Sequence, residues 1–238
     1  MIESGYAGKG KSAGSYRPDG TLNMGLIKDA KSIARRDPAA RNALEVFFLY
    51  PGYHALIYHK IAGAFYKIRL KFIARWISQI CTRRTGIEIH PGATIGQELF
   101  IDHGHGVVIG ETAVVGNNCT IYHQVTLGGT GRTRHCKRHP TVGNNVLIGA
   151  GSRILGPVHI GDNAMIGAGS VVVDDVPPGT TVTGVKAKVI KVDGERVVPS
   201  EALDQKTGDP YAGEIAAMKA RLEELEARLS ESGGKNDN

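Results

Sequence analysis

Apolar residues recur at every sixth position from residue 89 onward, and glycine often follows them directly. The apolar positions are Ile89, Ile95, Ile101, Ile109, Val115, Ile121, Leu127, Val142, Ile148, Ile154, Ile160, Ile166 and Val172. A period of six fits neither an α-helix nor a long strand, but it is typical of a parallel β-helix, in which each hexad forms a short strand and a turn. Three hexads make one coil, and stacked coils bury the apolar positions as a continuous column. The pattern therefore predicts a parallel β-helix in the middle of the chain.

Two insertions interrupt this repeat. The first adds two residues between Ile101 and Ile109, and the second adds nine between Leu127 and Val142. Insertions in solenoid proteins form loops on one face, which is often the binding face. Four of the nine histidines lie in these insertions, namely His103, His105, His135 and His139. Because imidazole titrates near neutral pH, the insertions are the main indication of chemistry in the chain.

The segment before the repeat has the pattern of helices. Asp37 and Pro38 predict a helix start, since Asp caps free N–H groups and Pro fits the first helical position. This helix is expected to continue over residues 39–50 until a Pro-Gly pair breaks it. A second helix is predicted over residues 53–81, where apolar residues recur at close to 3.6 positions: Leu56, Ile57, Ile61, Phe65, Ile68, Phe72 and Trp76.

These helices are basic, because no Asp or Glu occurs between Val46 and Ile87. A basic helical face can meet a membrane or nucleic acid, and it can equally be a solvated face or a contact between subunits. The sequence alone leaves these alternatives open, with the solvated or inter-subunit face favoured.

After the repeat, Pro177-Pro178-Gly179 ends the regular column, and a short return follows over residues 182–192. Near the C-terminus, Ile215, Met218, Leu222, Leu225 and Leu229 alternate spacings of three and four residues. This heptad pattern fits a short coiled coil or a helix docked on its own chain. The expected α+β organisation is a flexible N-terminal extension (1–24), a helical domain (25–84), a β-helix domain (85–192), and a linker with a C-terminal helix (193–238).

Composition narrows the class of protein. The chain has 238 residues, of which 41% are hydrophobic and 22% charged, as in globular proteins. Its three cysteines are too few for a disulfide scaffold. There is no N-terminal apolar signal region and no apolar run long enough to cross a bilayer, so we expect a cytoplasmic protein without a membrane partner. The net charge of +6 permits an anionic ligand but is too small to indicate nucleic acid.

Several motifs, in this order, resemble those of serine O-acetyltransferase. They are Arg36-Asp37-Pro38-Ala39, Tyr53-His54-Ala55-Leu56, Gly86-Ile87-Glu88-Ile89-His90-Pro91, Ile101-Asp102-His103, Val125-Thr126-Leu127-Gly128-Gly129-Thr130-Gly131, Arg138-His139-Pro140 and two Ile-Gly-Ala-Gly segments. The resemblance covers roughly residues 25–192. It implies a left-handed parallel β-helix of hexapeptide repeats behind a short helical domain. It also implies acetyl transfer from acetyl-CoA to the hydroxyl of L-serine, giving O-acetylserine for cysteine biosynthesis, with no metal.

The resemblance also assigns roles to residues. The catalytic histidine falls on His103, and its carboxylate partner falls on Glu88, where many members have Asp. The residues that bind serine fall on Asp37, Asp102, Arg138 and His139. The residues that bind CoA fall on Gly128, Gly129, Ala150, Ala168 and Lys188.

The chemistry of these side chains agrees with the assigned roles. Imidazole is a suitable general base at neutral pH, so His103 can take the proton of the serine hydroxyl. Glu88 can accept a hydrogen bond from the other ring nitrogen and fix the tautomer, as in the histidine–carboxylate part of a catalytic triad. Arg138 suits the serine carboxylate, because guanidinium binds carboxylate in a bidentate manner. A backbone N–H of the glycine-rich loop can stabilise the oxyanion.

Other interpretations of the residues stay open at this point. From spacing alone Asp37 caps a helix, and Glu88 and Arg138 are solvated charges. The same fold also carries acetyltransferases that act on sugars or other hydroxyl acceptors. A γ-type carbonic anhydrase would instead use histidines as zinc ligands, drawn from His103, His105, His123 and His139. A non-catalytic assembly protein would rely on the terminal helix.

The expected partners follow from the resemblance. We expect a homotrimer or a dimer of trimers, with each active site between two chains. L-Cysteine is expected to act as a feedback inhibitor, because it is isosteric with serine. Many members bind cysteine synthase through a C-terminal tail that ends in Ile, whereas this chain ends in Lys235-Asn236-Asp237-Asn238. We therefore expect no binding of cysteine synthase by that mode.

Overall fold

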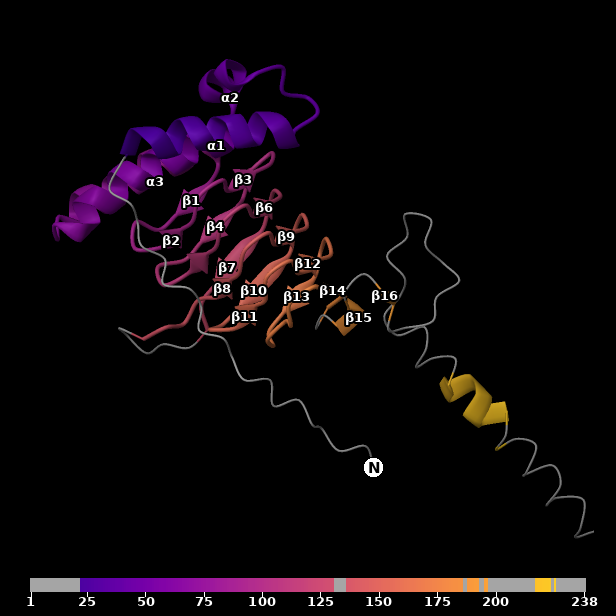
Figure 1. Ribbon diagram of the computed structural model, residues 1–238. Coiled ribbons are helices and arrows are strands. Elements are labelled where there is room, and N and C mark those ends of the chain that lie inside the picture. The colour runs from indigo at the N-terminus through magenta and orange to yellow at the C-terminus, as the bar shows by residue number, and fades with distance from the viewer. Residues whose placement is uncertain are drawn as a thin grey trace, which may run out of the picture.

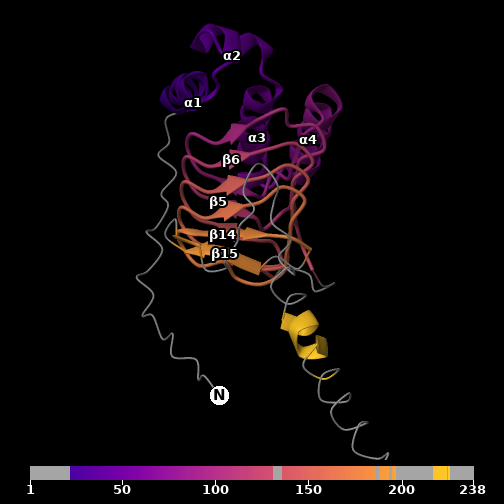
Figure 2. The same cartoon turned by 90° about the vertical axis from the view of Figure 1, so that its right-hand side faces the viewer.

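A computed structural model of the chain describes residues 22–130, 136–185, 188–192, 195–196, 217–223 and 225. Helices gather at one end of a column of short strands, and strands β14 to β16 lie at the other end (Figure 1). The view at right angles shows the coils of the column stacked on one another, with α3 and α4 side by side (Figure 2). The predicted order of a helical segment followed by a parallel β-helix is confirmed.

The helical segment differs from the prediction in where its helices begin and end. The helices are α1 (Leu22–Arg36), α2 (Ala43–Leu49), α3 (Pro51–Lys67) and α4 (Lys71–Thr85). The predicted helix start at Asp37 is wrong, because α1 ends just before this residue. The next helix is capped instead by Asn42, whose side chain accepts a hydrogen bond from the backbone N–H of Glu45. Residues 37–42 therefore form the connection between α1 and α2.

The second predicted helix is also divided. Its expected range of residues 53–81 contains the junction between α3 and α4, where Arg69 takes a left-handed conformation with φ of 66°. The apolar stripe of the two helices is only partly covered. Phe72 is 83% exposed and Trp76 is 60% exposed. The apolar period of 3.6 correctly predicts that both segments are helical. It does not indicate which of the apolar side chains are buried against other parts of the chain.

The column is built of parallel strands in three sheets. Its strands are β1 (Glu88–Ile89), β2 (Thr94–Ile95), β3 (Phe100–Ile101), β4 (Val108–Ile109), β5 (Val114–Val115), β6 (Thr120–Ile121), β7 (Thr126–Gly128), β8 (Thr141–Val142), β9 (Leu147–Ile148), β10 (Arg153–Leu155), β11 (His159–Ile160), β12 (Met165–Ile166), β13 (Val171–Val172) and β14 (Thr180–Thr183). Sheet A contains β1-β4-β7-β10-β13, sheet B contains β11-β8-β5-β2, and sheet C contains β3, β6, β9, β12 and β14. Strands β15 (Lys188–Val192) and β16 (Glu195–Arg196) extend sheet C in the antiparallel sense.

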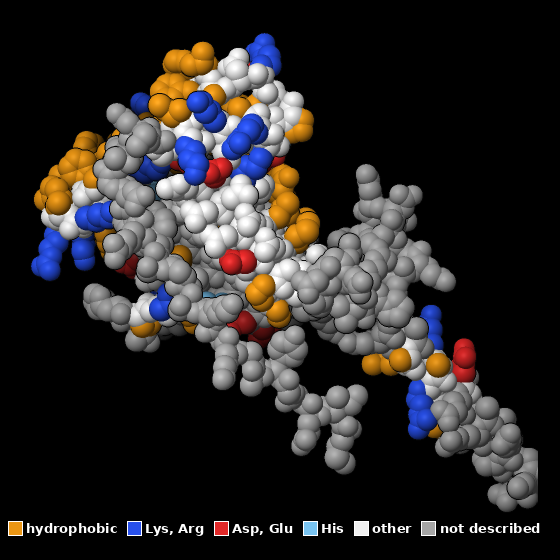
Figure 3. Space-filling model, viewed as in Figure 1, with side chains coloured by type: hydrophobic (Ala, Val, Ile, Leu, Met, Phe, Trp, Pro, Cys, Tyr) orange, Lys and Arg blue, Asp and Glu red, His pale blue; other side chains and the backbone are white. Residues whose placement is uncertain are grey.

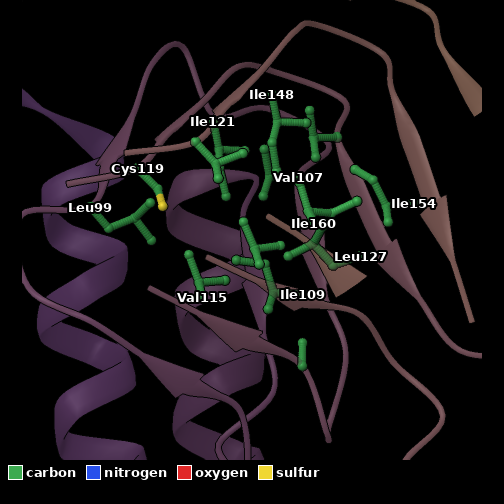
Figure 4. Close-up of a cluster of buried hydrophobic side chains, with 14 of the residues drawn as sticks. Leu99, Val107, Ile109, Val115, Cys119, Ile121, Leu127, Ile148, Ile154 and Ile160 are labelled. Carbon is green, nitrogen blue, oxygen red and sulfur yellow. The ribbon is translucent and has the colours of Figure 1, made fainter. Parts of the chain in front are cut away.

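Three consecutive strands, one in each sheet, complete one coil of the column. The chain therefore turns at three edges, which we name by the sheets they join: the A/B edge, the B/C edge and the C/A edge. All thirteen hexad positions point toward the axis, and all but Ile95 are buried. Figure 4 shows several of these side chains meeting in the interior, together with Leu99, Val107 and Cys119. The predicted apolar column is confirmed.

Arg36 fastens the end of α1 to the B/C edge. Its guanidinium donates hydrogen bonds to the backbone oxygens of Glu98 and Cys119 and lies over the ring of Phe100. This contact places the residue that follows, Asp37, at a fixed position relative to the β-helix.

Two further sequence predictions concern membranes and the C-terminus. No helix in the described part of the chain has the length and apolar character needed to cross a membrane. Residues 217–223 are helical, and Met218, Leu222 and Leu225 are exposed. Ile215 and Leu229 of the predicted heptad stripe lie outside the described residues, so the coiled coil stays a prediction.

Candidate functional site

The first insertion forms a bulge on the C/A edge. In the regular coils, the backbone N–H groups of Gln124, Gly151 and Gly169 donate to the carbonyls of His105, His123 and Ala150 in the coil beneath. Before the bulge, β3 pairs with β6 in register, so Asp102 directly after β3 aligns with Tyr122 directly after β6 in the next coil. The two extra residues are therefore His103 and Gly104, which protrude between regular positions of the edge.

His103 is presented to solvent by this bulge. Its side chain is 77% exposed, and its Nε2 lies 3.6 Å from Oδ1 of Asp102. Its backbone has φ of 56°, a left-handed conformation that is uncommon for a residue other than glycine and tends to occur at functional sites. An exposed imidazole beside a carboxylate is available to a substrate from outside the chain.

Glu88 lies one coil beneath the bulge. Its backbone N–H donates to the carbonyl of Val107, so β1 runs directly against the loop that carries His103. The Glu88 carboxylate accepts a hydrogen bond from Nη2 of Arg75 on α4, at 3.4 Å. Among the described residues Glu88 makes no hydrogen bond with His103. The structure thus brings Glu88 to the same region and adds Arg75, which the sequence motifs did not indicate.

Asp37 and Asp102 approach the site from two different elements. Oδ1 of Asp37 accepts a hydrogen bond from the backbone N–H of Ala39 at 2.8 Å, and its Oδ2 accepts one from the Tyr50 hydroxyl at 2.6 Å. Burial and the carboxylate of Asp37 raise the pKa of Tyr50 to about 12, with a smaller contribution from Asp102. Both carboxylates therefore act on the same hydroxyl. Sequence reasoning missed Tyr50, because only the fold brings its hydroxyl to Asp37.

The second insertion leaves the A/B edge between β7 and β8. Its residues 131–135, including His135, lie outside the described residues. The returning part carries Arg138, whose Nη2 donates to the carboxylate of Glu111 at 3.2 Å. Arg138 and His139 also donate their backbone N–H groups to Oγ1 of Thr112. Thr112 thus holds both residues at the edge, a role that the motif did not indicate.

The ring of His139 is buried and has a defined tautomer. Its Nδ1 accepts a hydrogen bond from the backbone N–H of Thr112 at 3.2 Å, and that group can only donate. The remaining proton of the neutral ring is therefore on Nε2, on the side of Gly129. Burial lowers the pKa of His139, and the neighbouring Arg138 lowers it further. Near neutral pH His139 is a neutral donor.

The residues predicted to bind CoA are divided between two edges. Ala150 and Ala168 continue the C/A edge above His105 and His123, in line with the bulge. Gly151 and Gly169 follow them, and a Cβ added at either position would meet no atom within 4 Å, so this edge is open. Gly128 ends β7 beside Leu155, and Gly129 follows it at the A/B edge, beside His139. Lys188 begins β15, and its side chain is outside the described residues.

One chain does not bring the predicted site residues together. His103 and Asp102 lie on the C/A edge, whereas Arg138 and His139 lie on the A/B edge, and sheet A separates the two edges. The chain therefore carries two half-sites. Within the described residues, no three His, Cys, Asp or Glu side chains gather in a way that could hold a metal ion.

Comparisons with known proteins agree with this architecture. Residues 139–174 match the model of the bacterial transferase hexapeptide family, described as six repeats. The serine acetyltransferase of Synechococcus elongatus is 51% identical over 204 residues, which are 86% of this chain and 82% of that protein. The enzyme of Helicobacter pylori strain J99 is 56% identical over 170 residues, or 71% and 99% of the two chains. The enzyme of Bacillus subtilis is 46% identical over 206 residues, or 87% and 94%.

Solved structures give the same result. The structure of Neisseria gonorrhoeae serine acetyltransferase in complex with serine has a TM-score of 0.68 and 43% identity, over 71% of this chain and 68% of that one. The Brucella abortus enzyme in complex with coenzyme A has a TM-score of 0.68 and 41% identity, over 70% and 66%. The left-handed β-helix, the exposed histidine on its edge and these similarities lead to one conclusion. The chain belongs to the serine acetyltransferase family.

Proposed function

We propose that this chain transfers the acetyl group of acetyl-CoA to the hydroxyl of L-serine, giving O-acetylserine and CoA, the first step of cysteine biosynthesis. The observation that carries the proposal is the exposed imidazole of His103 on the C/A edge, next to Asp102, whose carboxylate acts together with Asp37 on the Tyr50 hydroxyl. A base beside two carboxylates suits an acceptor that has both a hydroxyl and a positively charged amino group. A sugar hydroxyl acceptor, the main alternative, gives no reason for two carboxylates at this place.

The proposed reaction needs one base and no covalent enzyme intermediate. His103 takes the hydroxyl proton of serine as the oxygen attacks the thioester carbonyl. The tetrahedral intermediate then collapses, the C–S bond breaks, and the proton on His103 passes to the departing CoA thiolate. Glu88 supports this cycle by favouring the imidazolium that forms, and Arg75 supports it by holding the Glu88 carboxylate in place.

Serine recognition is divided between the two half-sites. Asp37 and Asp102 accept hydrogen bonds from the ammonium group, and Arg138 binds the carboxylate. The neutral His139 carries its Nε2–H beside Gly129, where it can donate to the serine carboxylate or to the thioester sulfur. L-Cysteine offers the same ammonium and carboxylate groups, so we propose that it competes for this pocket as a feedback inhibitor.

The division into half-sites supports an oligomer. The C/A edge of one copy supplies His103 with Ala150 and Ala168, and the A/B edge of a second copy supplies Arg138, His139 and the glycines of the CoA groove. Three copies close this arrangement around a threefold axis.

The helices add a second reason for association, since α2 and α4 expose a set of large apolar side chains: Leu44, Phe47, Phe48, Leu49, Phe72 and Trp76. Figure 3 shows apolar side chains gathered over the helical end of the molecule. We therefore propose a trimer or a dimer of trimers.

The test is the release of CoA thiol from acetyl-CoA on addition of L-serine. L-Homoserine, a galactoside and buffer serve as acceptor controls. We expect release with serine that falls by about 10²- to 10⁴-fold in His103→Ala, the usual range for the loss of a general base. His105→Ala is the matched control, because His105 also borders Gly104 but holds a regular position of the edge.

Two results would contradict the proposal. Release with the galactoside but not with serine would identify a sugar acetyltransferase. If His105→Ala lost its activity while His103→Ala stayed fully active, the proposed reaction would stand. The general base would then be His105 and not His103.

A further inference from the structure

Tyr50 has a fixed backbone at the junction of α2 and α3. Its N–H donates to the carbonyl of Val46, at 3.2 Å, and its own carbonyl accepts from the N–H of His54, at 3.0 Å. Pro51 follows directly, and the residue before a proline is restricted to extended conformations. Tyr50 has φ of −90° and ψ of 110°, in agreement with this restriction. The direction of its side chain is therefore set by the ends of two helices.

The Tyr50 side chain joins an apolar cluster to the acidic half-site. Its ring packs against the buried cluster that lies beneath the helices, which consists of Ala30, Ile33, Val46, Tyr53 and Phe100. At its other end, the hydroxyl donates to Oδ2 of Asp37 at 2.6 Å, a short distance that is typical of a hydrogen bond to a carboxylate. The backbone N–H of Ala39 donates to the other carboxylate oxygen. Asp37 is thus held at both oxygens, and each oxygen keeps a lone pair for a further donor.

The hydroxyl of Tyr50 keeps its proton at physiological pH and can therefore donate it. Its pKa is raised to about 12, first by burial and then by the hydrogen bond and charge of Asp37. The charges of Glu45 and Asp102 add to this rise, and Asp37 is the carboxylate in contact with the hydroxyl. Near neutral pH the Tyr50 hydroxyl is therefore protonated and can donate to Asp37.

We propose that Tyr50 is a positioning residue that determines specificity for the amino group of the acceptor, and that it acts through Asp37. This inference rests on the proposed transfer to serine. A carboxylate held by two hydrogen bonds is pre-organised to accept a third from the ammonium group of serine. Without the Tyr50 hydroxyl, the Asp37 carboxylate loses one of these bonds and can turn away from the ammonium group. An acceptor that lacks the amino group does not use Asp37, so its reaction does not depend on Tyr50.

The test compares Tyr50→Phe with the wild type on two acceptors, L-serine and 3-hydroxypropionate, which is serine without its amino group. Tyr50→Phe should raise the KM for serine about ten-fold, the scale of one hydrogen bond to a charged group, with little change in kcat or in the KM for acetyl-CoA. The kcat/KM for 3-hydroxypropionate should be unchanged. Tyr58→Phe is the matched control, because Tyr58 lies on α3 near Tyr50 in sequence and its hydroxyl accepts a hydrogen bond from Arg84 instead.

A second variant links the effect to Asp37. Asp37→Asn should produce a selective loss for serine, and Tyr50→Phe added to Asp37→Asn should then cost little more. If Tyr50→Phe does not fold, the selective loss in Asp37→Asn is the deciding measurement, and equal losses for both acceptors would overturn the inference.

Three results would overturn the proposal for Tyr50. They are an unchanged KM for serine in folded Tyr50→Phe, equal losses for the two acceptors, and the same loss in Tyr58→Phe. Absence of serine-dependent thiol release in the wild type would contradict the proposed function itself, and this outcome is visible before any variant is measured.

Discussion

Glycine at residues 110 and 129 leaves the space that the ring of His139 occupies. A Cβ at residue 110 would lie 2.0 Å from Cδ2 of His139, and a Cβ at residue 129 would lie 3.0 Å from its Nε2. Neither glycine has a positive φ, so the position requires the absence of a side chain and not an unusual backbone. The A/B edge can therefore hold a buried histidine with a defined tautomer only because these two residues are small.

This leads to a prediction at the scale of single residues. Gly110→Ala should displace the ring of His139 while the neighbouring Ile109 still fills the core. We expect the kcat/KM for serine to fall by about 10- to 100-fold, since displacements near 1 Å in an active site have effects of this size. Gly63→Ala on α3 is the matched control, because its added Cβ would lie at an ordinary 3.6 Å from the carbonyl of Pro91. Full activity in folded Gly110→Ala would mean that the reaction does not need His139 in its present place.

Single residues also show how far sequence reasoning extends. His103 and Asp102 could be found because the insertion breaks a regular period, and a broken period is visible in the sequence. Tyr50 and Arg75 could not be found in this way. Each lies 13 positions from its partner, Asp37 and Glu88 respectively, and only the packing of the helices brings the pairs into contact. The roles given to the site residues stay predictions until the variants are measured.

At the scale of elements, the β-helix was more predictable than the helices. In the β-helix each hexad repeats the same local environment, so thirteen positions report on one structure and all but Ile95 are buried. In the helices the ends depend on individual contacts. Asn42 caps α2 while Asp37 is engaged with Tyr50, and a left-handed Arg69 lies in the junction after α3. A hydrophobic period predicts a helical face but does not identify the surface that covers it.

The uncovered face of α4 leads to a prediction about assembly. Phe72 and Trp76 are one helical turn apart and lie on the same side of the helix. Replacing both with Glu should lower the molar mass in solution, measured by light scattering during size-exclusion chromatography, because charged side chains do not enter an apolar contact. The far-ultraviolet circular dichroism spectrum should be unchanged.

Lys71→Glu tests whether charge alone has this effect. Lys71 begins α4 and is exposed, so its replacement adds negative charge beside the stripe without removing apolar surface. Dissociation in Lys71→Glu, or an unchanged mass in the variant with both glutamates, would show that the apolar face of α4 is not a contact between copies.

At the scale of the whole molecule, the distribution of the site residues determines how many chains an active site needs. The C/A edge holds His103 and Asp102, and the A/B edge holds Arg138 and His139. Because both edges belong to rigid coils of one column, they cannot move together within a chain. The proposed roles of these residues therefore predict a site in which the C/A edge of one copy faces the A/B edge of another.

This requirement predicts complementation between inactive variants. Chains with His103→Ala keep an intact A/B edge, and chains with Arg138→Ala keep an intact C/A edge. Each variant alone should retain at most about 1% of the wild-type activity. Assemblies that mix the two at random should contain intact sites at about one quarter of their interfaces, and should recover activity in that proportion.

The measurement is serine-dependent thiol release by assemblies purified from co-expressed chains that carry different tags. Chains with His103→Ala and Asp102→Ala provide the control, because both changes affect the same edge and mixing them restores no site. If the His103→Ala and Arg138→Ala mixture is no more active than the separate variants, the active site lies within one chain.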